Sequence, residues 1–221
     1  MNYRFTDRTG GLSTGAFGSL NLALHVDDDP EVVSKNRQIV QAQIGLPIQY
    51  MEQVHGDEVA LVESPSLLAP TADALLTQVK GIALAVMVAD CIPLLLANQG
   101  AVAAVHVGRR GLLNGVAAKT LSQLRALDSS PVTAIVGPSI CGNCYEVSQE
   151  IFEEVTDRYP LSSARTPTGA FSLDLSKALI HELIEHGVTV IDEGRCTAEE
   201  SSLYSYRRDG MTGRQVGIVW L

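Results

Sequence analysis

The sequence has no long apolar run and no excess of positive charge. Its longest apolar stretch, residues 81–89, is far shorter than the roughly 20 residues that a membrane-spanning helix needs. The 221 residues carry a formal net charge of −9, which disfavours binding to nucleic acid or to an anionic membrane. The first residues lack the apolar core of a secretory signal. We therefore expect a cytoplasmic protein that binds neither nucleic acid nor membrane.

The sequence also lacks low-complexity tracts and convincing linkers. Hydrophobic residues make up 46% of the chain and charged residues 19%, which is ample material for a buried core. We therefore expect one domain over residues 1–221. The four cysteines are expected to be thiols or metal ligands rather than disulfides, because the expected compartment is reducing.

Strand and helix patterns alternate along the chain. Asp29 is a good N-cap for a helix that begins at Pro30 and is ended by Gly45. Strands are predicted at 82–88, 93–97, 101–107, 132–136, 188–191 and 216–220. Further helices are predicted at 149–158, at 175–186, and from 108–111 through an apolar stripe that ends at Leu124. This interleaving predicts an α/β fold with a mixed sheet.

Short groups of polar residues interrupt the apolar segments at three places. Asp90 and Cys91 lie between two strands, His106 lies near the end of another, and Gln53 and His55 stand beside apolar residues. His55, Cys91 and His106 would form a zinc site with a fourth position left for water or substrate. Their spacing matches no local metal motif, so a buried thiol and two hydrogen-bonded core histidines are the alternative.

Candidate partners of the histidines follow from the same groups of polar residues. Asp90, Gln53 or a backbone carbonyl would fix the orientation of an imidazole ring. Asp90 is also the candidate for proton transfer, because it is the neighbour of Cys91.

Arginines cluster in two places in this acidic sequence. Arg207, Arg208 and Arg214 share one segment, and Arg109 and Arg110 precede a predicted helix, whose free N–H groups favour anions. Guanidinium groups match phosphate geometry, so a phosphate co-substrate or a phosphorylated ligand is one interpretation. Surface salt bridges are the other.

Cys141 and Cys144 form a C-x-x-C pair, which can be half of a zinc site or a redox pair. The sequence has no second C-x-x-C. We therefore expect two thiols near a strand-to-helix turn and no metal.

Many segments, taken in order along the chain, resemble the YfiH-type laccase-domain family, also called polyphenol-oxidase-like or peptidoglycan editing factor proteins. The matching segments are 10–13, 19–22, 36–37, 53–56, 72–75, 89–93, 106–111, 137–140, 144–147, 204–210 and 212–214. The resemblance implies a single domain with mixed sheets in an α/β/β/α layered arrangement. It implies zinc at His55, Cys91 and His106, with copper as the second candidate metal. It adds Arg37 to the candidate substrate- or phosphate-binding residues, which are otherwise Gln53, Arg110, Arg207 and Arg208.

The sequence departs from the family pattern at two positions. Arg109 stands where the family usually has tryptophan, and Cys141 stands where glycine is common. The role of that aromatic ring is therefore in question for this chain.

The resemblance implies a zinc-dependent purine nucleoside phosphorylase acting on adenosine, inosine or methylthioadenosine, with adenosine deamination as an associated activity. Its partners would be a nucleoside and phosphate, and the chain would be a monomer or a small homo-oligomer. A cysteine-type amidase or hydrolase that edits a peptidoglycan precursor, with Cys91 as nucleophile and His106 as base, is the alternative. A copper polyphenol oxidase (laccase) is disfavoured, because the sequence has only five histidines and no His-x-His pair.

Overall fold

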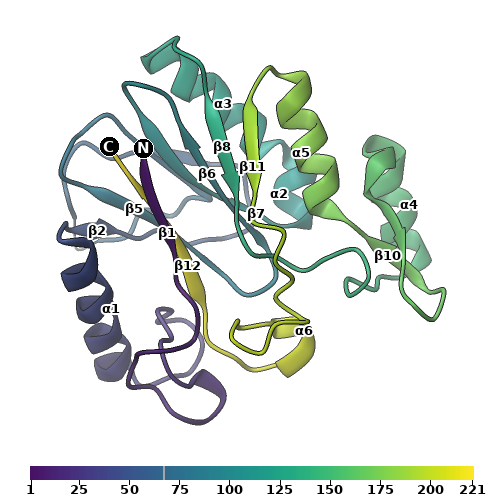
Figure 1. Cartoon of the computed structure of the whole chain (residues 1–221), viewed down its shortest axis with the longest axis horizontal. Coiled ribbons are helices and arrows are strands. Elements are labelled where there is room, and N and C mark those ends of the chain that lie inside the picture. Colours follow the sequence, from purple (N-terminus) through teal and green to yellow (C-terminus); the bar gives the residue numbers. More distant parts are fainter. Residues whose placement is uncertain (67) are drawn as a thin grey trace.

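The computed structural model describes residues 1–66 and 68–221 as stacked layers of sheet and helix (Figure 1). One sheet has the strand order β11 (Thr189–Asp192), β8 (Thr133–Val136), β6 (Ile92–Ala97), β7 (Val102–Val107), β4 (Ala74–Thr77) and β3 (Val59–Leu61). The other has the order β1 (Asn2–Phe5), β12 (Gln215–Trp220), β5 (Ala83–Val88) and β2 (Ile48–Gln49). Each sheet contains parallel and antiparallel pairs.

Strand β5 shows why the central strands read as continuous apolar runs. Successive side chains of a strand point to opposite faces. The odd-numbered residues of β5 pack in the core beneath the first helix, whereas its even-numbered residues pack in the core between the two sheets. Both faces are buried, so neither carries the polar residues of a solvent-facing strand.

Helices cover the outer face of each sheet. The four-stranded sheet is covered by α1 (Pro30–Ile44), which contributes Val40 to their shared core. The six-stranded sheet is covered by α2 (Arg109–Asn114), α3 (Val116–Leu127) and α5 (Leu175–Glu185). The fold class predicted from the sequence, α/β with mixed sheets in an α/β/β/α arrangement, is confirmed.

The predicted element boundaries hold closely. Asp29 caps α1 by accepting a hydrogen bond from the Glu31 N–H, and Gly45 ends the helix in the left-handed conformation at φ 75°. Each predicted strand is present to within one residue at either end. One helix prediction was wrong, because Gly115 takes φ 76° and divides the segment into α2 and α3.

The remaining elements lie at the periphery. Helix α4 (Gln149–Arg158) packs with the small β9–β10 sheet (Ser163–Arg165 and Phe171–Leu173) to the right of the main body in Figure 1. The short elements are η1 (Gly15–Phe17), η2 (Pro160–Ser162) and α6 (Tyr206–Asp209). Among the described residues, no helix combines the length and apolar character needed to cross a bilayer.

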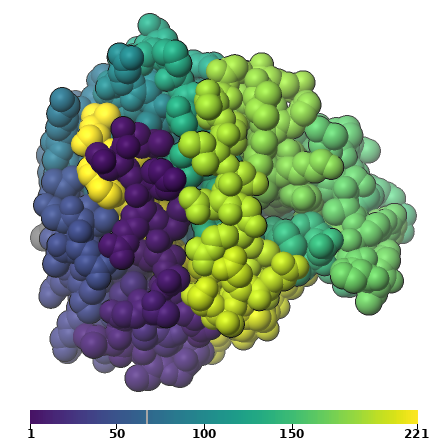
Figure 2. Space-filling view, viewed as in Figure 1, coloured from purple at the N-terminus to yellow at the C-terminus, as the bar shows by residue number. Residues whose placement is uncertain are grey.

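Two features bring distant segments to one end of the sheets. Residues 89–91 carry the chain from β5 in one sheet to β6 in the other, and β6 then pairs antiparallel with β7, so that Pro93 faces His106. The purple N-terminal residues also lie beside the yellow-green segment that precedes β12 (Figure 2), where the Arg8 N–H donates to the Ser202 carbonyl at 2.9 Å.

Candidate metal centre and substrate cavity

His55, Cys91 and His106 converge from three separate elements. His55 lies in the loop between β2 and β3, Cys91 precedes β6, and His106 is the penultimate residue of β7. One ligand atom from each of these residues lies within 4.8 Å of the other two, and the Cys91 Sγ is 3.9 Å from the His55 Nε2. The imidazole rings meet edge to face, with centroids 4.7 Å apart. The structure therefore brings these three predicted residues together.

The Asp73 carboxylate organises two of these residues. It is fully buried and lies 2.8 Å from the His106 Nδ1. It also accepts backbone hydrogen bonds from Val54 at 3.2 Å, His55 at 3.0 Å and Gly56 at 2.6 Å. Burial alone would raise the pKa of Asp73, but the hydrogen bonds from His106 and Gly56 outweigh burial and lower it.

An ionised Asp73 fixes the tautomer of His106. A carboxylate can only accept, so the His106 Nδ1 must donate the hydrogen bond that joins them. The Nε2 lone pair of the neutral ring then faces the cluster, as required for a metal ligand. The His106 backbone N–H adds a second link to the same residue by donating to the Asp73 carbonyl at 2.8 Å.

The thiol of Cys91 is activated by its neighbours. Burial would raise its pKa, but the adjacent His106 and His55 outweigh burial and lower the pKa to about 6. Burial would lower the pKa of His106, whereas Cys91 and Asp73 raise it to about 9. The attraction between the Cys91 thiolate and the His106 imidazolium contributes to both shifts. Without a metal, this ion pair is therefore favoured near neutral pH.

The loop that carries His55 is anchored on its other side by Gln53. The Gln53 amide donates to the Met87 carbonyl and accepts from the Met87 N–H, each at 2.8 Å, as a neighbouring strand would. His55 itself takes φ 59°, an unusual value for a residue with a side chain. The predicted residue Gln53 thus lines the cavity and also fastens the His55 loop to β5.

Gly108 allows the ligands to approach the backbone. A Cβ at this position would lie 2.9 Å from the Cys91 Sγ and 3.3 Å from the His55 Cδ2. Any side chain here would displace two of the three ligand residues. The Gly that follows β7 is therefore required by packing, although its φ is ordinary.

The cluster lies on the wall of a cavity of about 410 Å³. This volume is within the range of small-molecule sites, roughly 300–1,000 Å³. Apolar and aromatic lining comes from Met87, Ile140, Tyr145 and Tyr206, and polar lining includes His25, Asp90, Arg207 and Arg214. The cavity thus combines a ligand cluster, two cations and aromatic surface.

Two arginines face this cavity. The Arg207 guanidinium lies over the Tyr145 ring, 5.1 Å from its centroid. The Arg214 guanidinium is fixed by its Nη1, which donates to the Thr212 and Gly213 carbonyls. Burial lowers the pKa of Arg214, but guanidinium groups in proteins remain protonated.

The other predicted arginines lie outside the cavity lining. Arg208 is exposed, and its guanidinium binds the Asp209 carboxylate and backbone carbonyls. Arg110 is exposed in a separate surface hollow beside Arg109. Arg37 stacks on the Tyr50 ring at 4.0 Å from its centroid and donates to the Leu22 carbonyl. The structure does not place these three guanidinium groups among the residues that line the cavity beside His55, Cys91 and His106.

Asp90 has a different set of contacts from the one expected. Its carboxylate accepts from the Thr197 hydroxyl and from the Arg207 N–H, each at 2.6 Å. It therefore ties the turn before β6 to the segment around α6. The contact with a histidine, for which Asp90 was a candidate, is made by Asp73 instead. The proton-transfer role of Asp90 stays a prediction.

Sequence reasoning missed several residues of the site. Asp73 carried a usable signal, because it is a lone carboxylate between Ala72 and Ala74 at the start of an apolar run. Tyr145, Tyr206 and His25 carried none. They lie in loops or in the short helix α6, and their shared cavity follows from long-range packing.

Comparisons with known proteins cover nearly the whole chain. The family model described as multi-copper polyphenol oxidoreductase laccase matches residues 2–221. A Corynebacterium glutamicum protein named purine nucleoside phosphorylase is 42% identical over 228 residues, covering 98% of this chain and 93% of the relative.

Solved structures agree with the sequence comparisons. The Neisseria meningitidis protein NMB0706 superimposes with a TM-score of 0.91 at 38% identity, covering 99% of this chain and 93% of its own. The Bacillus licheniformis protein YfiH superimposes with a TM-score of 0.90 at 27% identity, covering 98% and 91%.

Proposed function

Because this chain belongs to the family described as multi-copper polyphenol oxidoreductase laccase, some of whose members are named purine nucleoside phosphorylases, we propose that it is a zinc-dependent purine nucleoside phosphorylase. The resemblance to YfiH-type proteins is confirmed. The observation that carries the proposal is the convergence of His55, Cys91 and His106 in a cavity that also contains Arg207 and Arg214.

The three residues suit zinc as a donor set. Two neutral imidazoles and one thiolate are common zinc ligands, and three protein ligands leave a position open. A bound zinc ion would supply Lewis acidity to an oxygen of phosphate, substrate or water. Copper is the weaker candidate. Within residues 1–66 and 68–221, His55 and His106 are the only histidines in a group able to hold a metal, whereas a trinuclear copper cluster needs many more.

Different cavity residues would bind different parts of the substrates. Arg207 and Arg214 would bind phosphate through charge-assisted hydrogen bonds. Tyr145 and Tyr206 would pack against the purine. In phosphorolysis a phosphate oxygen forms a bond to C1′ of the ribose, the bond from C1′ to the purine nitrogen breaks, and the purine leaves with a proton. Asp90, which lines the cavity, is the proposed residue for moving that proton.

Product analysis tests the reaction type. Adenosine, inosine and methylthioadenosine are incubated with the purified protein, with and without phosphate. We expect free base and a sugar 1-phosphate, formed only when phosphate is present. Formation of inosine and ammonia from adenosine would instead identify deamination. Absence of turnover with all three nucleosides would reject the proposal.

A matched pair of variants tests the phosphate site. Arg207→Ala removes a cation from the cavity and should raise the KM for phosphate about tenfold or more, the usual value of one charged hydrogen bond. Arg110→Ala removes an exposed cation outside the cavity and should leave that KM nearly unchanged. The reverse result would place phosphate beside α2.

A second candidate function has one specific observation in its favour. Cys91, His106 and Asp73 form a chain of nucleophile, base and orienting carboxylate, and the thiol has a lowered pKa. This arrangement suits an amidase acting on a peptidoglycan precursor. Metal removal separates the two candidates, because it should abolish phosphorolysis, whereas it would free the thiol for amide cleavage.

A further inference from the structure

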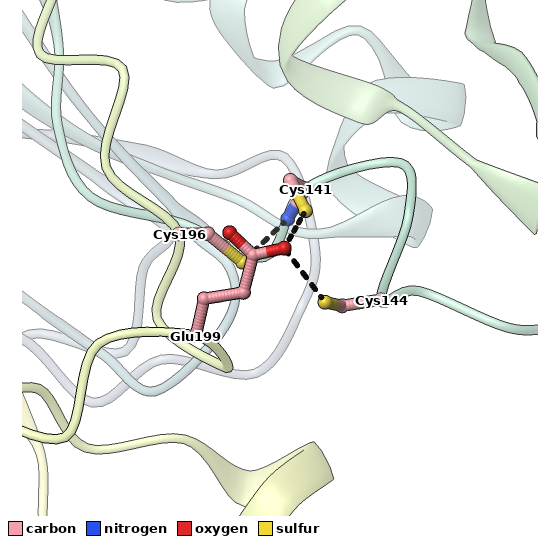
Figure 3. A group of neighbouring side chains, drawn as sticks. All are labelled: Cys141, Cys144, Cys196 and Glu199. Atoms are coloured by element: carbon pink, nitrogen blue, oxygen red, sulfur yellow. Dashed lines mark hydrogen bonds between the residues drawn. The ribbon is translucent and has the colours of Figure 1, made fainter. Parts of the chain in front are cut away.

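A second group of metal-ligating side chains lies away from the His55–Cys91–His106 cluster. Cys141 and Cys144 come from the segment after β8, and Cys196 and Glu199 come from the segment after β11 (Figure 3). In Figure 3 the Glu199 carboxylate and the three sulfur atoms point toward one another. The sequence predicted two thiols without a metal at the C-x-x-C pair, whereas the structure adds Cys196 and Glu199 to them as a group of four potential ligands.

The backbone holds the two segments in register. Ser139 and Cys196 form a parallel bridge, in which the Ser139 N–H donates to the Arg195 carbonyl and the Thr197 N–H donates to the Ser139 carbonyl. The C-x-x-C pair closes a tight turn, because the Cys144 N–H donates to the Cys141 carbonyl at 3.0 Å. The four side chains are thus presented by defined backbone rather than by chance contact.

The distances between ligand atoms match a tetrahedral metal site. Zinc bonds of about 2.3 Å to sulfur and 2.0–2.2 Å to oxygen at tetrahedral angles place those two atoms about 3.5–3.7 Å apart. The Glu199 Oε1 lies 3.7 Å from the Cys141 Sγ and 3.6 Å from the Cys144 Sγ. All four ligand atoms lie within 4.8 Å of one another.

The donor set selects the kind of metal. Three sulfurs exclude a hard cation such as Mg²⁺ or Ca²⁺, which prefers oxygen. An iron–sulfur cluster distributes its cysteines over two or more irons around a larger core, whereas these four ligand atoms lie within 4.8 Å of one another, as around a single ion. The backbone N–H of Cys141 also donates to the Cys196 Sγ at 3.4 Å, a contact that supports a thiolate at that sulfur.

We propose that Cys141, Cys144, Cys196 and Glu199 bind a structural zinc ion, separate from the metal of the cavity. Four protein ligands complete the tetrahedron and leave no position for substrate. The ion would join two segments that are 55 residues apart at Cys141 and Cys196. Both segments continue into the cavity wall, one through Tyr145 and the other through Arg207.

Zinc content measured by mass spectrometry tests the proposal. The full chain is purified under reducing conditions and compared with Cys91→Ala and Cys196→Ala. We expect about two zinc ions in the wild type and about one in each variant, because each variant loses a different site. A single zinc in the wild type that disappears in Cys91→Ala would overturn the second site without affecting the proposed function. A disulfide among Cys141, Cys144 and Cys196 in the reduced preparation would also overturn it.

Two substitutions at Glu199 keep the test independent of folding. Glu199 is exposed, so Glu199→Ala should fold and yet bind the second zinc more weakly. Glu199→Cys replaces oxygen by sulfur and should retain it. We expect the Tm to fall by more than about 5 °C in Glu199→Ala and to recover in Glu199→Cys, since a bound ion stabilises the folded state. Equal zinc content in the wild type and Glu199→Ala would remove Glu199 from the ligand set.

Discussion

The two cysteine clusters place thiol groups in opposite electrostatic surroundings. Cys91 stands between imidazoles, and they lower its pKa to about 6 against the effect of burial. The pKa of Cys141 is raised, first by burial and then by Cys196, and the pKa of Cys144 is raised, first by burial and then by Cys141. A thiol beside a base is ionised before any metal arrives, whereas thiols beside one another need a cation to ionise together. The first arrangement suits chemistry in an open cavity, and the second suits a structural ion.

The sharpest test of this difference is the loss of one thiol from each cluster. Cys91→Ala should reduce kcat/KM by more than roughly 100-fold, beyond the 10- to 100-fold typical of residues that only orient a metal ligand. Cys144→Ala should change kcat/KM by less than about tenfold, because that residue lies outside the cavity lining. Steady-state kinetics and zinc content are measured together. Full zinc content in Cys91→Ala would reject the ligand assignment.

Asp73 and Asp90 offer a finer comparison within the cavity region. Asp73→Asn should weaken zinc binding at His55–Cys91–His106 by roughly 10- to 100-fold, because the amide disturbs the hydrogen bond to the His106 Nδ1. Asp90→Asn should leave zinc affinity nearly unchanged, since that carboxylate contacts Thr197 and Arg207. Competition with a chelator measures both affinities. Equal losses would mean that Asp90 also supports the metal.

Gly108→Ala disturbs one cluster without removing any ligand. The new methyl group would lie 2.9 Å from the Cys91 Sγ, so the thiol must shift. We expect zinc affinity at the cavity site to fall about tenfold, while the site at Cys141, Cys144, Cys196 and Glu199 serves as an internal control. If chelator competition finds both zinc affinities unchanged, the close approach of Cys91 to Gly108 does not matter for metal binding.

The smallest expected effect is the pH dependence of thiol alkylation in metal-free protein. Thiolates react and thiols do not, so a lowered pKa places the midpoint of the Cys91 alkylation rate near pH 6. The midpoints of Cys141 and Cys144 should lie above the ordinary value of a thiol, since their pKa values are raised. At pH 7 the Cys91 rate should exceed the other two rates by at least a few-fold, because its larger thiolate fraction outweighs the weaker nucleophilicity of a more acidic thiolate.

Peptide mapping by mass spectrometry follows each cysteine separately. A Cys91 midpoint near that of an ordinary thiol would mean that the imidazoles do not stabilise its charge in solution. The assigned contrast between the two clusters would then fail.

Local sequence patterns predicted much of the fold and the proximity of Cys91 to His106. The strands predicted at 93–97 and 101–107 are adjacent in sequence, and their antiparallel pairing places the residue before β6 beside the end of β7. The meeting of Cys91 and His106 is therefore encoded in two adjacent strands. His55 is different, because it arrives on a loop whose position depends on Asp73 and Gln53.

The misjudged residues share a physical cause. Arg207 and Arg208 are neighbours in a short helix, yet Arg207 lines the cavity and Arg208 does not. No periodic pattern in four residues tells these directions apart. Cys196 and Glu199 reach the C-x-x-C pair through the bridge between Ser139 and Cys196, which is a tertiary contact without a local sequence signal.

The buried carboxylate of Asp73 has a consequence for how the proposed zinc ion would be acquired. It locks the His55 loop and the His106 ring to one another through hydrogen bonds that involve no metal. The three candidate ligands are therefore preassembled, and binding of the proposed ion would not require the chain to fold around it. Apoprotein prepared by dialysis should regain full activity on the timescale of mixing with the ion, without a refolding phase.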